Sequence, residues 1–419
     1  MSVIFRSLSP LTLPLISALI LTLTISGCSV VNVLKLRYAN DDVEPIWSHS
    51  NSQFDLATDY IGEKVFVYGS INGVDGFKFM IDTGASFTLL FDSPKVLALN
   101  LPQGYDLNLA GWGDEQDSLG YQTNMESLKF GQMEVTNFKG AFVKMSKTPY
   151  FERADELIYD GVIGHDLLRH FVWTLDKKAN RVTIANIPYQ ATDKDKAIPF
   201  ETFMSKISIN GDIDFGSGHT TAHDFIIDTG SRHYFKLSSQ YPKANDIKLP
   251  EAQVTAADFG LSGKAEHQRV TLPHITLGDI EIEKVKTNII KSDDEDDYWI
   301  IGNATFNQFI TTLDYQTSKL YLQPYNDQAF KSRYNLLGLE VRKLLSGDFL
   351  VRYVMPELPA ITSGFTAGDV ITRVNGIDAK NISKDLWLSI SATPGKYEIC
   401  RESLPCENLE SKHIKGYSN

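Results

Sequence analysis

The sequence predicts a mainly β protein in which two homologous β-rich lobes are followed by a small α+β domain. Three observations carry this prediction: short runs of β-branched and aromatic residues bounded by Gly, Asn and Asp, an internal repeat, and a change of pattern near residue 334. At 419 residues the chain is long enough for two or three folding units. Its 42% hydrophobic and 22% charged residues are close to globular averages, which excludes wholesale disorder and a polytopic membrane protein.

The charge balance argues against one class of partner. There are 40 Lys plus Arg against 52 Asp plus Glu, a formal net charge of −12, which opposes a grip on phosphate backbones. We therefore expect no nucleic-acid partner.

The amino terminus has the layout of a secretory signal peptide, assigned to residues 1–27. Arg6 precedes an apolar stretch over residues 11–25, and no acidic residue occurs before Cys28. The alternative is an uncleaved membrane helix, but Pro10 and Pro14 lie near its start and the stretch is shorter than the ~20 residues that span a bilayer.

Ile25-Ser26-Gly27-Cys28 resembles the bacterial lipoprotein cleavage box, in which a cysteine is lipidated and becomes the new first residue. The resemblance implies that Cys28 carries a lipid anchor and that residues 28–49 form a tether. Ser29 follows the cysteine, and in that family the absence of Asp there implies the outer membrane. We expect a protein of the bacterial cell envelope, attached to a membrane and facing the periplasm; which membrane holds the anchor stays open.

The body of the chain contains the same unit twice, assigned to residues 50–190 and 191–327. Ser-Ile-Asn-Gly occurs at residues 70–73 and 208–211, and an apolar run ending in Asp-Thr-Gly occurs at 79–84 and 225–230. Later, Val162-Ile163-Gly164 matches Ile300-Ile301-Gly302. The second copy carries extra residues within 212–224, as a loop tolerates.

Strands are predicted at runs of four to eight β-branched and aromatic residues. These are Val65–Ile71, Phe77–Ile81, Val135–Val143, Arg181–Ile184, Asp224–Ile227 and Lys319–Leu322. The segments His165–Phe171 and Ala304–Phe309 have apolar residues at helical spacing, which predicts one short helix near the end of each lobe.

The two Asp-Thr-Gly loops indicate chemistry. One such triplet arises easily by chance, but here both end a buried strand, both precede a small residue, and both are followed about 80 residues later by an apolar-apolar-Gly segment. Placed face to face, the loops bring Asp82 and Asp228 together. Two such carboxyls share a proton, so that one acts as base and the other as acid on a water held between them.

These lobes resemble aspartic proteases, in particular the retroviral type: apolar strand, Asp-Thr-Gly-Ala, then an Ile/Val-Gly segment with a short helix. The resemblance covers about residues 50–325 and implies a single-chain version of a dimeric protease, monomeric because both lobes are present. It makes Asp82 and Asp228 the catalytic pair. It also makes Thr83, Gly84, Thr229, Gly230 and Ser231 the support of the active loops.

The two loops differ at the position after Gly, which is Ala85 in one and Ser231 in the other. We expect the Ser231 hydroxyl to bond the outer oxygen of Asp228 and to bias that carboxyl toward the charged role.

The family also implies a hairpin flap over the substrate. The candidate in the first lobe is Gly111-Trp112-Gly113, preceded by Ala110, with residues 259–263 as its counterpart. An ordinary turn with a packed Trp is the open alternative.

Residues 334–419 resemble a bacterial PDZ domain, on the string from Pro359 to Ile371 and on Val374-Asn375-Gly376. The resemblance implies that a backbone loop at Leu337, Gly338 and Leu339 holds the carboxylate of a peptide tail beside a sheet edge. Inert packing against the lobes is the alternative.

Three cysteines occur, and assigning Cys28 to lipid leaves Cys400 and Cys406, six apart around a turn, as a candidate disulfide in an exported protein. No metal site is predicted. His219 and His223 lack the metalloprotease pattern, and residues 293–297 lack the spacing of a calcium loop.

The leading prediction is an aspartic endopeptidase that needs no cofactor and cleaves extended polypeptides. The alternatives are a catalytically inactive, lipid-anchored scaffold that binds peptides, which two intact Asp-Thr-Gly triplets disfavour, and a glycosidase, whose carboxylates stand about 5–9.5 Å apart.

Overall fold

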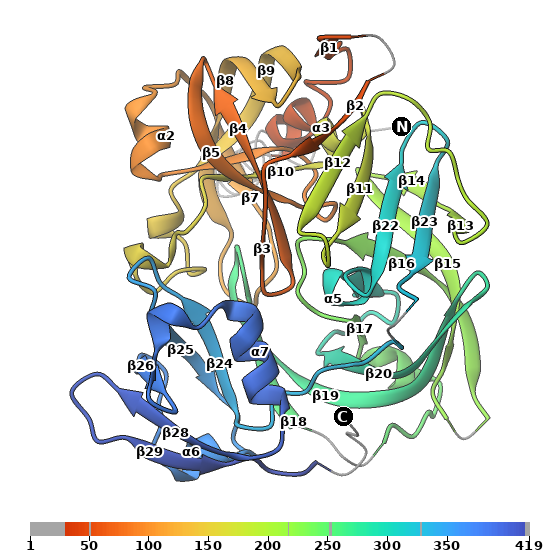
Figure 1. Ribbon diagram of the computed structural model, residues 1–419. Helices are drawn as coiled ribbons and strands as arrows, with labels where there is room; N and C mark the ends of the chain where they lie inside the picture. Colours follow the sequence, from red (N-terminus) through yellow and green to blue (C-terminus); the bar gives the residue numbers. More distant parts are fainter. Residues whose placement is uncertain (1–29, 50–51, 217, 251–253, 327–328, 415–419) are drawn as a thin grey trace, which may run out of the picture.

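The computed structural model describes residues 30–49, 52–216, 218–250, 254–326 and 329–414. Within these residues the chain forms four β-sheets: one in each lobe, one shared between the lobes, and one in the carboxyl-terminal domain (Figure 1). The predicted class, mainly β with two lobes, is confirmed.

The sheet of the first lobe carries the first Asp-Thr-Gly loop. Its strands are β1 (Ile46–Trp47), β3 (Thr58–Ile61), β4 (Lys64–Ile71), β5 (Val74–Ile81), β6 (Leu89–Phe91), β7 (Gln103–Leu109), β8 (Ser118–Phe130), β9 (Met133–Val143) and β10 (Gly161–Ile163). The helical segments beside it are residues 30–37, α2 (Pro94–Ala98), η1 (Met145–Lys147), η2 (Ala154–Glu156) and α3 (His165–Leu168). Strand β10 lies parallel to β5 and pairs with it directly before the loop.

The sheet of the second lobe repeats this plan. Its strands are β14 (Glu201–Phe203), β15 (Lys206–Asp214), β16 (Thr220–Asp228), β17 (Phe235–Ser238), β18 (Val254–Gly260), β19 (Gly263–Leu277), β20 (Ile280–Ile290) and β21 (Ile300–Gly302). Its helices are α4 (Gln240–Ala244) and α5 (Asn303–Phe306). Here β21 lies parallel to β16, as β10 does to β5, so the sequence repeat corresponds to a repeat of topology.

A sheet shared by the two lobes joins them. Its strands in spatial order are β13 (Lys196–Pro199), β23 (Lys319–Pro324), β22 (Phe309–Asp314), β11 (Val172–Asp176), β12 (Arg181–Ala185) and β2 (Gln53–Leu56). The central pair, β11 and β22, comes from equivalent positions of the two repeats, and Thr174 and Thr312 hydrogen-bond there at 2.9 Å. One continuous apolar core runs through both lobes, which fixes their relative position.

The predicted strands all lie within observed ones, whereas the two predicted helices are shorter than expected, one turn each. Phe79, Met80 and Ile81 are buried, and Ile226 in the second copy is half-buried. The extra residues of the second copy lengthen the β15–β16 hairpin.

The prediction that residues up to 49 form a tether is wrong for the described part. Leu36 is fully buried in the first lobe, and Asn40 donates to Asp166 at 2.9 Å and to the carbonyl of Lys139 at 2.7 Å. Strand β1 pairs with β9. An apolar residue and a satisfied buried amide make residues 30–49 an integral layer of the lobe.

The carboxyl-terminal domain has its own core and packs against the lobes. It contains β24 (Leu339–Lys343), β25 (Phe349–Val354), α6 (Pro359–Thr362), β26 (Val370–Val374), β27 (Ile377–Asp378), η3 (Ala379–Asn381), α7 (Lys384–Ala392), β28 (Lys396–Arg401) and β29 (Glu407–Glu410). Figure 1 shows it below the first lobe, beside the β18 end of the second lobe. Cys400 and Cys406 form the expected disulfide.

The predicted signal peptide and Cys28 lie outside the described residues. In the described ranges, no helix has the length and apolar character that crossing a membrane requires.

Candidate active site

Asp82 and Asp228 lie at equivalent places, where β5 and β16 end against the short parallel strands β10 and β21. The amide of Asp82 donates to the carbonyl of Ile163 at 3.1 Å, and the pairing of Asp228 with Gly302 is its counterpart. Asp82 directly follows β5 and Asp228 is the last residue of β16, so the position of each Asp is set by the sheet rather than by a free loop.

The two loops are braced against each other through Thr83 and Thr229. The amide of Thr83 donates to the hydroxyl of Thr229 at 3.0 Å, and the amide of Thr229 donates to the hydroxyl of Thr83 at 3.1 Å. Each hydroxyl in turn donates to the opposite strand, to the carbonyls of Ile227 at 2.6 Å and Ile81 at 3.0 Å. Four buried hydrogen bonds therefore lock the two lobes together at the site.

The carboxyls meet at the glycines of the loops. The amide of Gly84 donates to Oδ1 of Asp82 at 2.8 Å, and the amide of Ser231 donates to Oδ1 of Asp228 at 3.0 Å. A Cβ at Gly84 would lie 2.6 Å from Oδ1 of Asp228 and 3.0 Å from Oδ1 of Asp82, so both oxygens flank one point. A Cβ at Gly230 would lie 2.5 Å from Oδ1 of Asp82 and closer still to its Oδ2. Glycine is required at both positions because any side chain would displace a carboxyl.

Burial and the neighbouring carboxyl favour the protonated form of Asp82. Burial, followed by the negative charge of Asp228, raises the pKa of Asp82 to about 7. Asp82 therefore keeps its proton up to neutral pH beside Asp228, which is the arrangement that acid–base work by two carboxyls requires.

The expected role of the Ser231 hydroxyl is not found. Within the described residues its oxygen is buried and has no hydrogen-bond partner, and it is the Ser231 amide that bonds Asp228. The amide of Gly84 does the same for Asp82. Each loop therefore supplies a backbone donor, which explains why Ala85 and Ser231 can differ.

The Ile/Val-Gly segments pack behind the loops. A side chain at Gly164 would lie 2.5 Å from the carbonyl of Phe87, and Gly302 lies against the carbonyl of His233 in the same way. The amide of His165 donates to the carbonyl of Ala85 at 2.9 Å, and that of Asn303 to the carbonyl of Ser231 at 2.8 Å.

The predicted hairpins of both lobes reach over the site and meet tip to tip. The first runs from β7 to β8 and the second from β18 to β19. The amide of Ser262 donates to the carbonyl of Trp112 at 2.9 Å, and the amide of Gly111 donates to the Ser262 hydroxyl at 3.1 Å. The indole of Trp112 lies 3.6 Å from the Lys236 ammonium and 5.3 Å from the Tyr298 ring. Gly113 packs directly on the backbone of the opposite tip.

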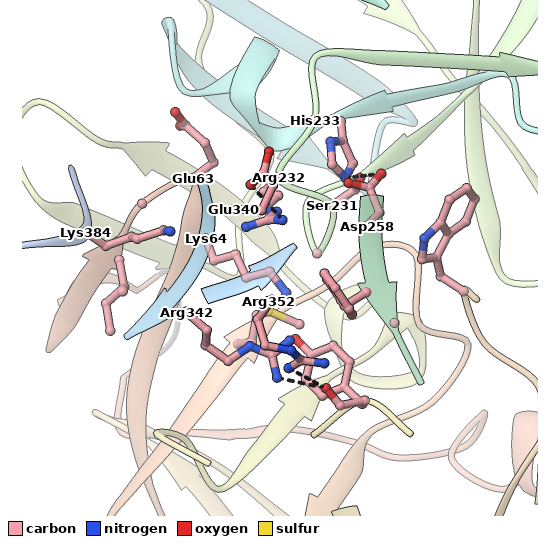
Figure 2. A pocket seen from close by; sticks show the side chains of 18 of the residues that line it. Glu63, Lys64, Ser231, Arg232, His233, Asp258, Glu340, Arg342, Arg352 and Lys384 are labelled. Carbon is pink, nitrogen blue, oxygen red and sulfur yellow. Dashed lines mark hydrogen bonds and ion pairs between the residues drawn. The ribbon is translucent and has the colours of Figure 1, made fainter. Parts of the chain in front are cut away.

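Together these elements enclose a cavity of about 400 Å³ that contains Asp82 and Asp228. One side of it is formed by the carboxyl-terminal domain, through residues of β24, β25 and α7. Figure 2 shows Glu340, Arg342, Arg352 and Lys384 reaching from that domain toward side chains of the lobes.

These domain contacts include charged residues that sequence reasoning missed. Glu340 pairs with Arg232 and Arg269, while Arg342 and Arg352 both bind the buried Glu156. Arg232 was detectable in the sequence, because it follows Ser231 in the active loop. The others carry no local signal, since their partners are more than 70 positions away.

The predicted carboxylate loop does not offer free donors at two of its positions. The amides of Leu337 and Gly338 both donate to the side-chain oxygen of Asn335, at 3.1 and 2.9 Å. On β24, the carbonyl of Leu339 accepts from Asn335 and that of Val341 accepts from Lys384. The domain's own side chains thus satisfy the groups that a peptide tail would use.

His219 and His223, for which no metal site is predicted, each pack on an aromatic ring. His223 stacks on Trp299 with ring centroids 3.9 Å apart, and His219 packs on Phe215. Among the described residues, the cluster with metal-ligand spacing is Glu398, Cys400 and Cys406, and the disulfide removes both thiolates.

A comparison with known protein families finds a similarity within the first lobe. Residues 67–167, which include Asp82 and the first hairpin, match the model of a family of aspartyl proteases. Among solved structures, the chain is similar to an aspartic proteinase from Irpex lacteus at 12% identity and a TM-score of 0.41, over 66% of this chain and 98% of that one. No curated protein matches the sequence at a significant level. The first lobe is thus similar to the aspartyl protease family. The second lobe repeats the topology and the Asp-Thr-Gly loop of the first lobe.

Proposed function

We propose that the chain is an aspartic endopeptidase with one active site built from both lobes. The observation that carries this proposal is the meeting of the two Asp-Thr-Gly loops, with Oδ1 of Asp82 and of Asp228 within 3.0 Å of one point and Asp82 protonated up to about pH 7.

In the proposed reaction a water lies between the two carboxyls. Asp228 takes a proton from the water as it attacks the peptide carbonyl, and Asp82 donates its proton to the carbonyl oxygen. As the tetrahedral intermediate collapses, Asp228 gives its proton to the leaving amine and Asp82 takes a proton back from a hydroxyl of the intermediate, which forms the new carboxyl group and restores the pair. The chemistry uses two carboxyls and water, so we expect no metal or organic cofactor.

The substrate is an extended polypeptide. Hairpin strands from both lobes border the cavity, and strand edges bind extended chains through backbone hydrogen bonds. A single chain supplies both lobes, so we expect a monomer.

Export and anchoring belong to the same proposal. The leader and the cleavage-box resemblance at Cys28 support a lipid anchor in the cell envelope, and the Cys400–Cys406 disulfide suits an oxidising compartment. In cells fed a radioactive fatty acid, the wild-type chain should be labelled and Cys28→Ala should not. Equal labelling of both chains would contradict the anchor.

The carboxyl-terminal domain is proposed to be PDZ-like. Because it forms one side of the cavity, we also propose that it controls the entry of polypeptide into the cleft. Peptide-tail binding at Leu337–Leu339 would first require Asn335 to release two amides.

The test of the proposal uses the purified full chain and an unfolded protein from acid to neutral pH. Cleavage should occur and should stop with an inhibitor that mimics the tetrahedral intermediate of aspartic proteases. Absence of inhibitor-sensitive cleavage at every pH would instead favour a peptide-binding scaffold.

A further inference from the structure

A glutamate of the carboxyl-terminal domain lies in the same cavity as the two aspartates. Glu340, on β24, has Oε1 at 2.9 Å from Nη1 of Arg269 and Oε2 at 3.4 Å from Nη2 of Arg232. Its side chain is 12% exposed and that of Arg269 is 7% exposed. Figure 2 shows Glu340 pointing at Arg232.

Both arginines belong to the second lobe and line the cavity that contains the two aspartates. Arg232 directly follows Ser231, whose amide bonds Asp228. Arg269 lies on β19, a strand of the second hairpin, and its side chain is held by Asn288 at 3.3 Å. The cations are therefore fixed by the catalytic lobe, whereas Glu340 comes from outside it.

The first lobe lacks this feature. Asp82 and Asp228 are equivalent, so Ser86 is the counterpart of Arg232, and Phe87 is the counterpart of the following residue, His233. An arginine that can bind a carboxylate therefore follows the active loop of the second lobe, whereas the equivalent position in the first lobe is a serine.

Two carboxylates, Asp258 and Glu340, lie near Arg232 and Arg269. Asp258 is engaged by His233 at 2.8 Å and lies 3.9 Å from Arg269. In the described part of the chain, Glu340 is the acidic partner of Arg232. Burial opposes ionisation of Glu340, but Arg269, Arg232 and Lys384 outweigh it and lower its pKa to about 2. Removing this carboxylate would take one of the negative charges away from these buried arginines, which is costly.

We propose that Arg232 and Arg269 form a carboxylate-binding subsite of the substrate cleft, and that Glu340 fills it in place of substrate while the carboxyl-terminal domain is docked. The inference rests on the proposed function and specifies its substrate class: polypeptides with a carboxylate at one fixed distance from the cleaved bond. Paired guanidinium groups suit a carboxylate because they present several donors in fixed geometry. The carboxylate comes from an Asp or Glu side chain or from the end of the polypeptide.

The experiment compares the full wild-type chain in detergent with Arg232→Gln and Glu340→Gln. Arg181→Gln and Glu410→Gln are matched controls, because both side chains are at least half exposed and neither lines the cavity. The probes are peptides in which Glu is moved through every position, each paired with its Gln version, with amidated or free carboxyl ends to separate the two sources of the carboxylate.

Cleavage is measured as kcat/KM. At one position, Glu should be preferred over Gln by about tenfold or more in the wild type, and Arg232→Gln should reduce that preference to about one. Glu340→Gln should keep the preference and raise kcat/KM for the acidic peptide several-fold, because the internal competitor is weakened. Dependence on the free carboxyl end alone would assign the subsite to the polypeptide terminus.

No preference at any position, or an unchanged preference in Arg232→Gln, would overturn the subsite while cleavage itself upholds the endopeptidase. If Arg232→Gln does not fold, Arg232→Lys takes its place and should weaken the preference, since it loses the fork of donors. If no peptide is cleaved, the binding of the same peptides to Asp82→Asn is measured by fluorescence anisotropy instead. A Glu preference there that Glu340→Gln strengthens would uphold the subsite and reject the endopeptidase, whereas equal binding of Glu and Gln peptides would reject both.

Discussion

At the scale of single residues, the protonation of Asp82 is the property on which the proposed chemistry depends. Burial and the charge of Asp228 raise the pKa of Asp82 to about 7. Since the proposed acid is the protonated form, kcat should fall as pH rises through about 7. A rate profile that stays flat or rises to pH 9 would contradict this assignment of roles.

The same shift affects stability. Between pH 4 and pH 7 folded Asp82 holds a proton that the unfolded chain has lost, so this group makes the free energy of unfolding fall as pH rises. Asp82→Asn removes that dependence and should therefore stabilise the chain more at pH 8 than at pH 5. The difference should be at least about 1 kcal/mol, since one pKa unit corresponds to about 1.36 kcal/mol. Denaturation of both proteins at the two pH values measures it.

The amides, rather than the hydroxyl, hold the carboxyls. Ser231→Ala should leave the pH–rate profile in place, because the bond to Asp228 comes from the backbone. Gly84→Ala places a methyl group 2.6 Å from Oδ1 of Asp228 and should lower kcat at least about 100-fold, as expected when a catalytic group is displaced. A shifted profile in Ser231→Ala would restore a role for the hydroxyl.

At the scale of elements, the two hairpins close the cavity through their tips. Trp112 contacts Lys236 and Tyr298, and its carbonyl accepts from Ser262. Trp112→Ala keeps the backbone hydrogen bond to Ser262 but removes the ring contacts with Lys236 and Tyr298 that hold the hairpin tip over the cavity. Substrate binding should weaken by roughly 1–1.5 kcal/mol, which raises KM about tenfold.

Leu119→Ala is the control for this hairpin, since Leu119 is the second residue of β8, is 77% exposed and should leave KM unchanged when replaced. Equal effects of the two substitutions, measured on one peptide, would show that the tip of the hairpin does not bind substrate.

Elements with strong local patterns were predictable from the sequence, and those held by distant contacts were not. The strands before Asp82 and Asp228 could be located because apolar runs, an Asp and a Gly occur together in both repeats. The packing of residues 30–49 on the lobe could not be predicted, because it depends on a hydrogen bond between Asn40 and Asp166, which lie 126 positions apart. Arg232 was visible beside the active loop, but its partner Glu340 belongs to another domain.

At the scale of the whole molecule, the carboxyl-terminal domain is attached to the cleft by buried charges. Glu156 is fully buried and binds Arg342 at 2.8 Å and Arg352. Glu156→Gln leaves two arginines without this anion and should destabilise docking by about 3 kcal/mol or more. Limited proteolysis at residues 329–333, between the second lobe and this domain, should accelerate.

Asp155→Asn is the matched control for docking, because Asp155 pairs with Arg153 at the surface and should change proteolysis little. Equal rates in wild type and Glu156→Gln would mean that the domain is held by other contacts, such as the apolar cluster around Leu336 and Met355.

The central claim is that both lobes contribute to one catalytic unit, and a double-substitution cycle of Asp82→Asn and Asp228→Asn tests it most directly. The measurement is kcat/KM on one peptide for wild type, both single variants and the double variant. Each single substitution should lower it at least about 1,000-fold, and the double should lower it no further, because residues that act as a unit are not additive. Retained activity in either single variant, or losses that multiply in the double, would contradict the account.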